Sequence, residues 1–117
     1  MRIFVLAITL MLTSTMVNNS KPFDQVIRGG SAPWVSADCS LNIVSWNIER
    51  GLDLAGVTAT LKEMRPAIVL LQEVDLNVRR TGNINIAEHL ASSLGMNYLF
   101  AVEFEELGQG NRSRPAY

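Results

Sequence analysis

The apolar and polar positions of this chain change their period several times, and these changes predict alternating strands and helices. Residues 41–48 are rich in branched and aromatic side chains, which favours a strand. Residues 67–74 form an almost unbroken apolar stretch, which is typical of a strand buried on both faces in a parallel sheet. A third strand is predicted over residues 96–104.

Two helices are predicted between these strands. Asp53 can cap a helix that ends where Pro66 prevents continuation. Asn83 can cap a second helix, and Gly95 provides its stop. The apolar positions at helical spacing are Leu54, Val57, Leu61 and Met64 in the first helix, and Ile86, Ala87, Leu90, Ala91 and Leu94 in the second. The strand-helix-strand-helix-strand order predicts an α/β fold.

A polar side chain closes each of the first two predicted strands, Asn47 in one and Glu73 in the other. Two parallel strands joined by a crossover helix finish at the same edge of the sheet, where ligands collect in open α/β folds. Carboxylate and amide oxygens are ligands that Mg²⁺ accepts, with water and substrate phosphate completing its coordination. The order of elements therefore allows Asn47 and Glu73 to lie side by side as metal ligands. Asn47 as a turn former and Glu73 as the partner of a nearby arginine remain open alternatives.

Three short motifs on these elements resemble the first motifs of the endonuclease/exonuclease/phosphatase superfamily, which has the fold of deoxyribonuclease I. They are Ser45-Trp46-Asn47-Ile48-Glu49-Arg50-Gly51, Leu70-Leu71-Gln72-Glu73-Val74-Asp75 and Arg79-Arg80-Thr81-Gly82-Asn83. The resemblance covers residues 41–117 and implies the N-terminal half of a two-sheet α/β sandwich. It also implies that Asn47 and Glu73 hold Mg²⁺ or Mn²⁺ for the hydrolysis of a phosphodiester or phosphomonoester by metal-activated water.

The later motifs of that superfamily are absent from the sequence. They are a Tyr near mid-chain, an Asp-x-Asn motif, a further Asp and a closing Asp-His, and they supply the base, the phosphate clamps and the general acid. The only histidine, His89, falls in the second predicted helix. We therefore expect a partial phosphoesterase domain that shows no turnover alone, because it has no group to activate water. The alternative is a non-catalytic product, either a truncated remnant or a small α/β binding module.

The loop predicted over residues 75–82 carries four further candidates. Arg79 and Arg80 have guanidinium groups that can bind a phosphate bidentately, although paired arginines also occur as solvated surface charge. Asp75 and Asn77 can orient water molecules on a metal, although ordinary loop polarity accounts for both equally well.

The N-terminal region indicates a leader followed by a linker. Residues 1–17 resemble a secretory signal peptide, since Arg2 precedes about ten apolar residues. A transmembrane helix needs roughly 20, so no membrane span is predicted. Residues 18–40 are rich in Ser, Pro, Gly and Asn and predict a linker. We expect a secreted or periplasmic protein. The alternatives are an uncleaved anchor, or a cytoplasmic protein if Met11 or Met16 is the true start.

Composition limits the classes of partner. With 48% hydrophobic residues the chain is globular, and Cys39, its only cysteine, excludes an internal disulfide. The 10 Lys and Arg residues against 11 Asp and Glu residues give a net charge of −1, which provides no general affinity for nucleic acid. The predicted partner is a phosphate ester, either nucleic acid or a small phosphoester, and its phosphate must be bound locally.

Overall fold

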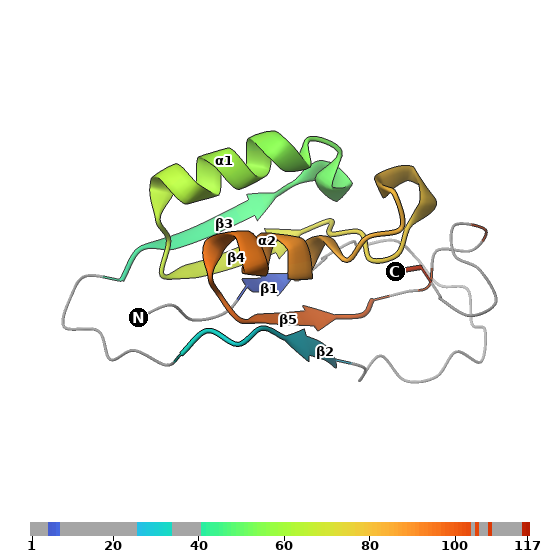
Figure 1. Ribbon diagram of the computed structural model, residues 1–117. Coiled ribbons are helices and arrows are strands. Elements are labelled where there is room, and N and C mark those ends of the chain that lie inside the picture. The colour runs from blue at the N-terminus through green and yellow to red at the C-terminus, as the bar shows by residue number, and fades with distance from the viewer. Residues whose placement is uncertain (1–4, 8–25, 34–40, 104, 106–107, 109–115) are drawn as a thin grey trace.

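The computed structural model describes residues 5–7, 26–33, 41–103, 105, 108 and 116–117, and the structural statements below concern these residues. They form a mixed α/β arrangement in which two helices lie on one face of a sheet (Figure 1). The α/β class expected from the sequence is therefore confirmed.

The sheet consists of two strand pairs joined by one short strand. Strands β3 (Ile43–Asn47) and β4 (Ile68–Gln72) are parallel, as the crossover prediction requires. Strand β2 (Val26–Gly29) runs antiparallel to β5 (Tyr98–Ala101). Between the two pairs lies β1 (Val5–Ala7), parallel to both β4 and β5. The strand order across the sheet is β2-β5-β1-β4-β3, so β3 and β2 are its edges.

Strands β1 and β2 lie in segments where the sequence predicted a signal peptide and a linker. Close packing against the start of β5 accounts for β2. The Asn97 side chain accepts a hydrogen bond from Ala32 N at 3.0 Å and donates one to Ala32 O at 3.0 Å, as a neighbouring strand would. A Cβ at Gly29 would lie 2.6 Å from the Tyr98 ring, so only glycine fits there without movement of that ring. Strands of three and four residues are too short to show a period-2 pattern.

Helix α1 (Leu54–Met64) begins and ends as predicted. The Asp53 side chain accepts a hydrogen bond from Gly56 N at 3.0 Å and caps the first turn. The helix stops at Arg65, which takes a left-handed conformation (φ 47°) directly before Pro66. Residues Val57 and Leu61 are buried against the sheet and the second helix.

Helix α2 (Ile86–Leu94) begins two residues later than predicted. Its cap is Asn85, whose side-chain oxygen accepts from Glu88 N at 3.1 Å, so the prediction of Asn83 as the cap is wrong. Asn83 has a φ of 57°, and its N–H closes a turn on Val78 O at 2.9 Å. Gly95 ends the helix in a left-handed conformation (φ 63°), as predicted.

Two short 3₁₀ helices flank the ends of the parallel strands. One covers Glu49–Gly51 after β3, and the other covers Arg79–Thr81 in the loop after β4.

The predicted third strand is confirmed but shorter, since β5 ends at Ala101; Phe104 lies outside the described residues. At the other end of the described chain, Tyr117 pairs with Leu76 through two backbone hydrogen bonds, Leu76 N to Tyr117 O at 2.6 Å and Tyr117 N to Leu76 O at 2.9 Å.

The core lies between the sheet and the two helices, which pack against each other. Its largest fully buried side chains are Leu61, Leu71, Ile86, Leu90, Val69 and Val78. Trp46 packs against this core while remaining partly exposed. Since side chains alternate along a strand, the intervening residues point to the other side of the sheet. We call this side the open face: it carries Ile43, Ser45, Ile68, Leu70, Leu99 and Ala101.

A buried tyrosine joins the start of α2 to β5. The Asn85 amide donates to the Tyr98 hydroxyl at 3.1 Å. Burial raises the pKa of Tyr98 above its ordinary 10.0, the Glu88 carboxylate raises it further, and the hydrogen bond from Asn85 opposes both. Tyr98 is therefore neutral at physiological pH.

In the described part of the chain, no helix combines the length and the apolar character that crossing a bilayer requires.

Candidate functional site

Asn47 and Glu73 meet at the edge of the sheet where β3 and β4 both end. Asn47 is the last residue of β3 and pairs in register with Gln72, the last residue of β4. Glu73 follows at once, and its Oε1 accepts a hydrogen bond from Asn47 Nδ2 at 2.9 Å. The two side chains are thus in contact, as the right-handed crossover between their strands predicted.

The backbone at this edge adopts unusual conformations. Glu73 has a φ of 52°, Glu49 has 48° and Arg50 has 65°, all in the left-handed region that residues with a side chain rarely occupy. Each such residue costs about 1 kcal/mol or more, and such costs concentrate at sites that bind or react. At Glu73 the turn ends β4 and leaves its carboxylate beside Asn47 rather than continuing the strand.

The oxygen atoms of this pair suit a hard divalent cation. Asn47 Oδ1 accepts a hydrogen bond from Glu49 N at 3.0 Å, which leaves one of its two lone pairs. At Glu73, Oε1 is engaged by Asn47, and Oε2 has further acceptor capacity. One carboxylate and one amide oxygen are enough for Mg²⁺, which keeps several waters and uses substrate phosphate oxygens. The described residues contain no cluster of three His, Cys, Asp or Glu side chains suited to a metal.

Asp75 and Arg80 form an ion pair within the loop that follows β4. Asp75 is only 4% exposed, and its carboxylate accepts two parallel hydrogen bonds from Arg80, from Nε at 2.8 Å and from Nη2 at 2.7 Å. The Thr81 hydroxyl adds a third at 3.3 Å. This bidentate arrangement is the strong form of a carboxylate–guanidinium contact. A phosphate bound by Arg80 would have to compete with Asp75.

Arg79 and Asn77 differ from this pair in their surroundings. The exposed Arg79 side chain donates from Nη2 to Gly108 O at 3.1 Å, a single contact to a neutral group. Asn77 has a left-handed backbone (φ 58°), and its N–H bonds to Ile84 O at 2.8 Å, which holds the loop closed. Of the two arginines that are candidates for binding phosphate, the geometry leaves Arg79 the more available.

A cavity of about 530 Å³ adjoins Asn47, and sequence reasoning did not predict it. Its walls combine the apolar side chains of Trp46 and Leu52 with the acidic residues Glu49 and Asp53. Leu52 is 67% exposed. The one signal in the sequence was this apolar residue within a short polar turn. The cavity lies directly beside Asn47.

Comparisons of the chain with protein-family models, curated proteins and solved structures give no match. The resemblance to the endonuclease/exonuclease/phosphatase superfamily thus rests on the three sequence motifs. Within the geometry of the site, the contact between Asn47 and Glu73 brings together the two side-chain oxygens that suit a divalent cation.

Proposed function

We propose that the end of the sheet where β3 and β4 both finish is the divalent-metal site of a phosphoesterase of the endonuclease/exonuclease/phosphatase type. On this proposal, residues 41–117 correspond to the N-terminal half of a deoxyribonuclease I-like sandwich. The observation that carries it is the 2.9 Å contact between Asn47 and Glu73 where two parallel strands end. This is the edge of an α/β sheet at which ligands bind.

In the proposed site, Glu73 and Asn47 hold Mg²⁺ or Mn²⁺ through their side-chain oxygens. A bound divalent ion supplies Lewis acidity toward a phosphoryl oxygen and offsets charge on the leaving oxygen. Glu73 contributes the full negative charge that binds the cation. Asn47 orients that carboxylate through its amide N–H, while the Glu49 N–H fixes the orientation of Asn47. Arg79 lies on the loop that follows β4, where its charge attracts a phosphate ester substrate.

The motifs that supply the base for the attacking water in this superfamily are absent from the sequence. Asp75, a nearby carboxylate, is buried and engaged by Arg80, and His89 is exposed on α2. General base catalysis needs a group within hydrogen-bond reach of the attacking water. The proposal is therefore metal binding with no turnover by this chain alone.

Metal binding can be tested directly on the full chain. Mn²⁺ should broaden the NMR signals of Asn47 and its neighbours in β3 and β4, and added Mg²⁺ should reverse the broadening by competition. Glu73→Gln keeps the shape of the side chain and removes its charge, so we expect Mn²⁺ affinity to fall at least tenfold. Glu63→Gln is the matched control, since Glu63 is an exposed acid on α1. Equal broadening in the wild type and in Glu73→Gln would refute the site.

A non-catalytic α/β binding module is the second candidate. The absence of the superfamily's later motifs from the sequence favours it. The two candidates differ in their response to metal, because only the phosphoesterase half-site predicts Mn²⁺ binding that depends on Glu73. An assay of the hydrolysis of a phosphodiester such as bis-p-nitrophenyl phosphate also tests the two candidates. Mg²⁺-dependent turnover that Glu73→Ala abolishes would contradict both the module and the expectation of an inactive half-site.

A further inference from the structure

A second cavity, of about 600 Å³, lies near the starts of β4 and β5, at the opposite end of the strands from Asn47 and Glu73. It is formed where α1 and α2 both end and where the chain turns into β4 and β5. Its size is within the range of pockets that bind small molecules. Because it is built from the other ends of the elements, it is separate from the proposed metal site.

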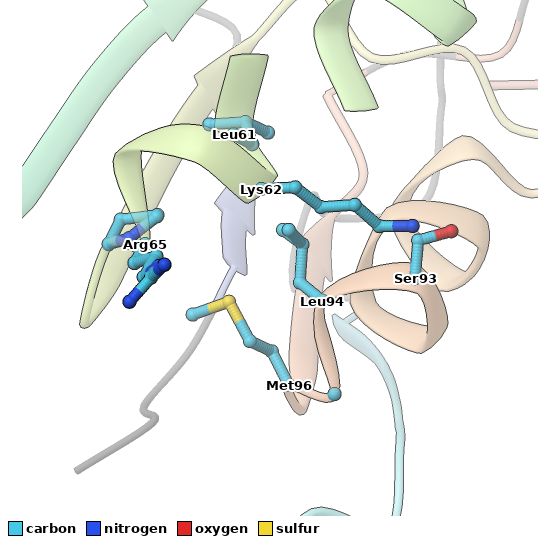
Figure 2. Close-up of a pocket in the computed structure, with 8 residues that line it drawn as sticks. Leu61, Lys62, Arg65, Ser93, Leu94 and Met96 are labelled. Atoms are coloured by element: carbon cyan, nitrogen blue, oxygen red, sulfur yellow. The ribbon is translucent and has the colours of Figure 1, made fainter. Parts of the chain in front are cut away.

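The cavity combines an apolar floor with two cations at its rim. In Figure 2, the side chain of Leu94 extends from the end of α2 toward α1, the side chain of Met96 extends toward Arg65, and Leu61 lies on α1. In this view, Lys62 extends from α1 toward Ser93 on α2, and Arg65 lies on the other side of Met96. Lys62 and Arg65 are exposed, whereas Leu61 and Met96 are buried.

Neither cation has an acidic partner within the part of the chain that the structure describes. The ends of the two helices contribute negative charge, roughly half an elementary charge each. Much of that is already used, since Met64 O accepts from the Asn42 side chain and Leu61 O accepts from Arg65 N. The two full positive charges therefore exceed the helix dipoles, and the rim attracts anions.

We propose that this cavity binds a small amphiphilic carboxylate, a molecule with one anionic group and a short aliphatic body. The carboxylate would lie against Arg65, whose guanidinium can bind both of its oxygens, and Lys62 would add positive charge from the other side of the cavity. The aliphatic body would cover Leu94 and Met96 and remove their apolar surface from water. A purely inorganic anion would leave the apolar floor uncovered, and a neutral aliphatic molecule would leave both cations without a partner.

Octanoate is a suitable probe, with the ¹³C-labelled methyl group of Met96 as the reporter and Met96→Leu to assign its signal. We expect octanoate to shift the Met96 signal saturably in the full chain. Lys62→Gln and Arg65→Gln should each weaken binding by up to about fivefold, as expected for exposed charge pairs, and the double variant by about tenfold or more. Arg28→Gln, which removes an exposed cation from β2, should leave octanoate binding unchanged.

Further ligands separate the contributions of charge and apolar contact. Octanol should bind more weakly than octanoate and should not respond to the Lys62 and Arg65 substitutions. Inorganic phosphate should not reproduce the shift of the Met96 methyl group. The proposal is overturned if octanoate binds the double variant as tightly as the wild type, or if inorganic phosphate causes the same Met96 shift as octanoate. Loss of Mn²⁺ binding would leave this inference intact, since the two sites share no residue.

Discussion

Single residues around the proposed metal site have separate tasks, and the Asp75–Arg80 pair shows this most clearly. In the sequence, Asp75 was a candidate for orienting water on the metal and Arg80 a candidate for binding phosphate, with ordinary loop polarity and surface charge as the alternatives. In the structure these two side chains bind each other within the loop that follows β4. This geometry gives the pair a role in fixing the loop that carries Arg79, a role that their positions in the sequence did not indicate.

Removing Arg80 should destabilise the fold more than removing Arg79. Arg80→Ala leaves the carboxylate of Asp75 buried, with the Thr81 hydroxyl as a remaining donor. Breaking a buried pair in this way costs about 3 to 5 kcal/mol, and because the Arg80 side chain is 26% exposed we expect about 2 kcal/mol. Arg79→Ala removes one exposed contact and should change the free energy of unfolding by about 0.5 kcal/mol or less.

Urea unfolding followed by circular dichroism measures both free energies. Equal losses in Arg79→Ala and Arg80→Ala would show that the ion pair does not stabilise the loop.

At the scale of elements, the sequence predicted β3, α1, β4, α2 and β5 in the correct order. The reason is physical: Val57 and Leu61 recur at helical spacing because they pack on a sheet, and Ile68 to Leu71 are apolar because β4 lies inside it. The same logic placed Asn47 beside Glu73, since strand ends follow from strand direction. The pairing of Asp75 with Arg80 could not be predicted, because a loop has no period that relates residues five positions apart.

The start of α2 shows where a local signal was present and missed. Both Asn83 and Asn85 precede an isoleucine, and asparagine is a good residue for capping a helix. Only Asn85 has a glutamate three residues later, the spacing of a capping box, and its side chain does bond to Glu88 N. That spacing distinguishes the two candidates in the sequence alone.

Replacing each asparagine in turn should therefore change the free energy of unfolding by unequal amounts. Asn85→Ala removes the cap of α2 and its hydrogen bond to Tyr98, so we expect a loss of about 1 kcal/mol or more in the free energy of unfolding. Asn83→Gly is the matched control, because glycine accepts the left-handed backbone of that position (φ 57°) and should be nearly neutral. Thermal unfolding of both variants gives the comparison. A larger loss for Asn83→Gly would contradict the assignment of the cap.

The whole molecule leaves one side of its sheet without a helix among the described residues. Helices α1 and α2 both lie on the other side, and the open face carries Ile43, Ile68 and Leu70. Ile43 is 52% exposed and lies on β3, an edge strand that has no neighbour on its outer side among the strands that the structure describes. Apolar faces and unpaired strand edges both favour association between molecules. A net charge of −1 provides little repulsion to oppose it.

We therefore expect the full chain to self-associate through the open face at concentrations of roughly 10 to 100 μM. Replacing Ile43 and Leu70 together by threonine keeps branched side chains suited to a strand and makes the face more polar. Sedimentation velocity should show a smaller average mass for this double variant than for the wild type. Leu52→Thr is the matched control, since Leu52 is more exposed than Ile43 but lies on a turn outside the sheet.

The result of this measurement also bears on the two candidate functions. A half-sandwich needs a second layer over the open face, so association that depends on Ile43 and Leu70 supports the phosphoesterase interpretation. A binding module complete in itself should be monomeric and should unfold in one cooperative transition. If the wild type is monomeric at these concentrations and melts sharply, the open face needs no cover, and the module becomes the better account of the chain.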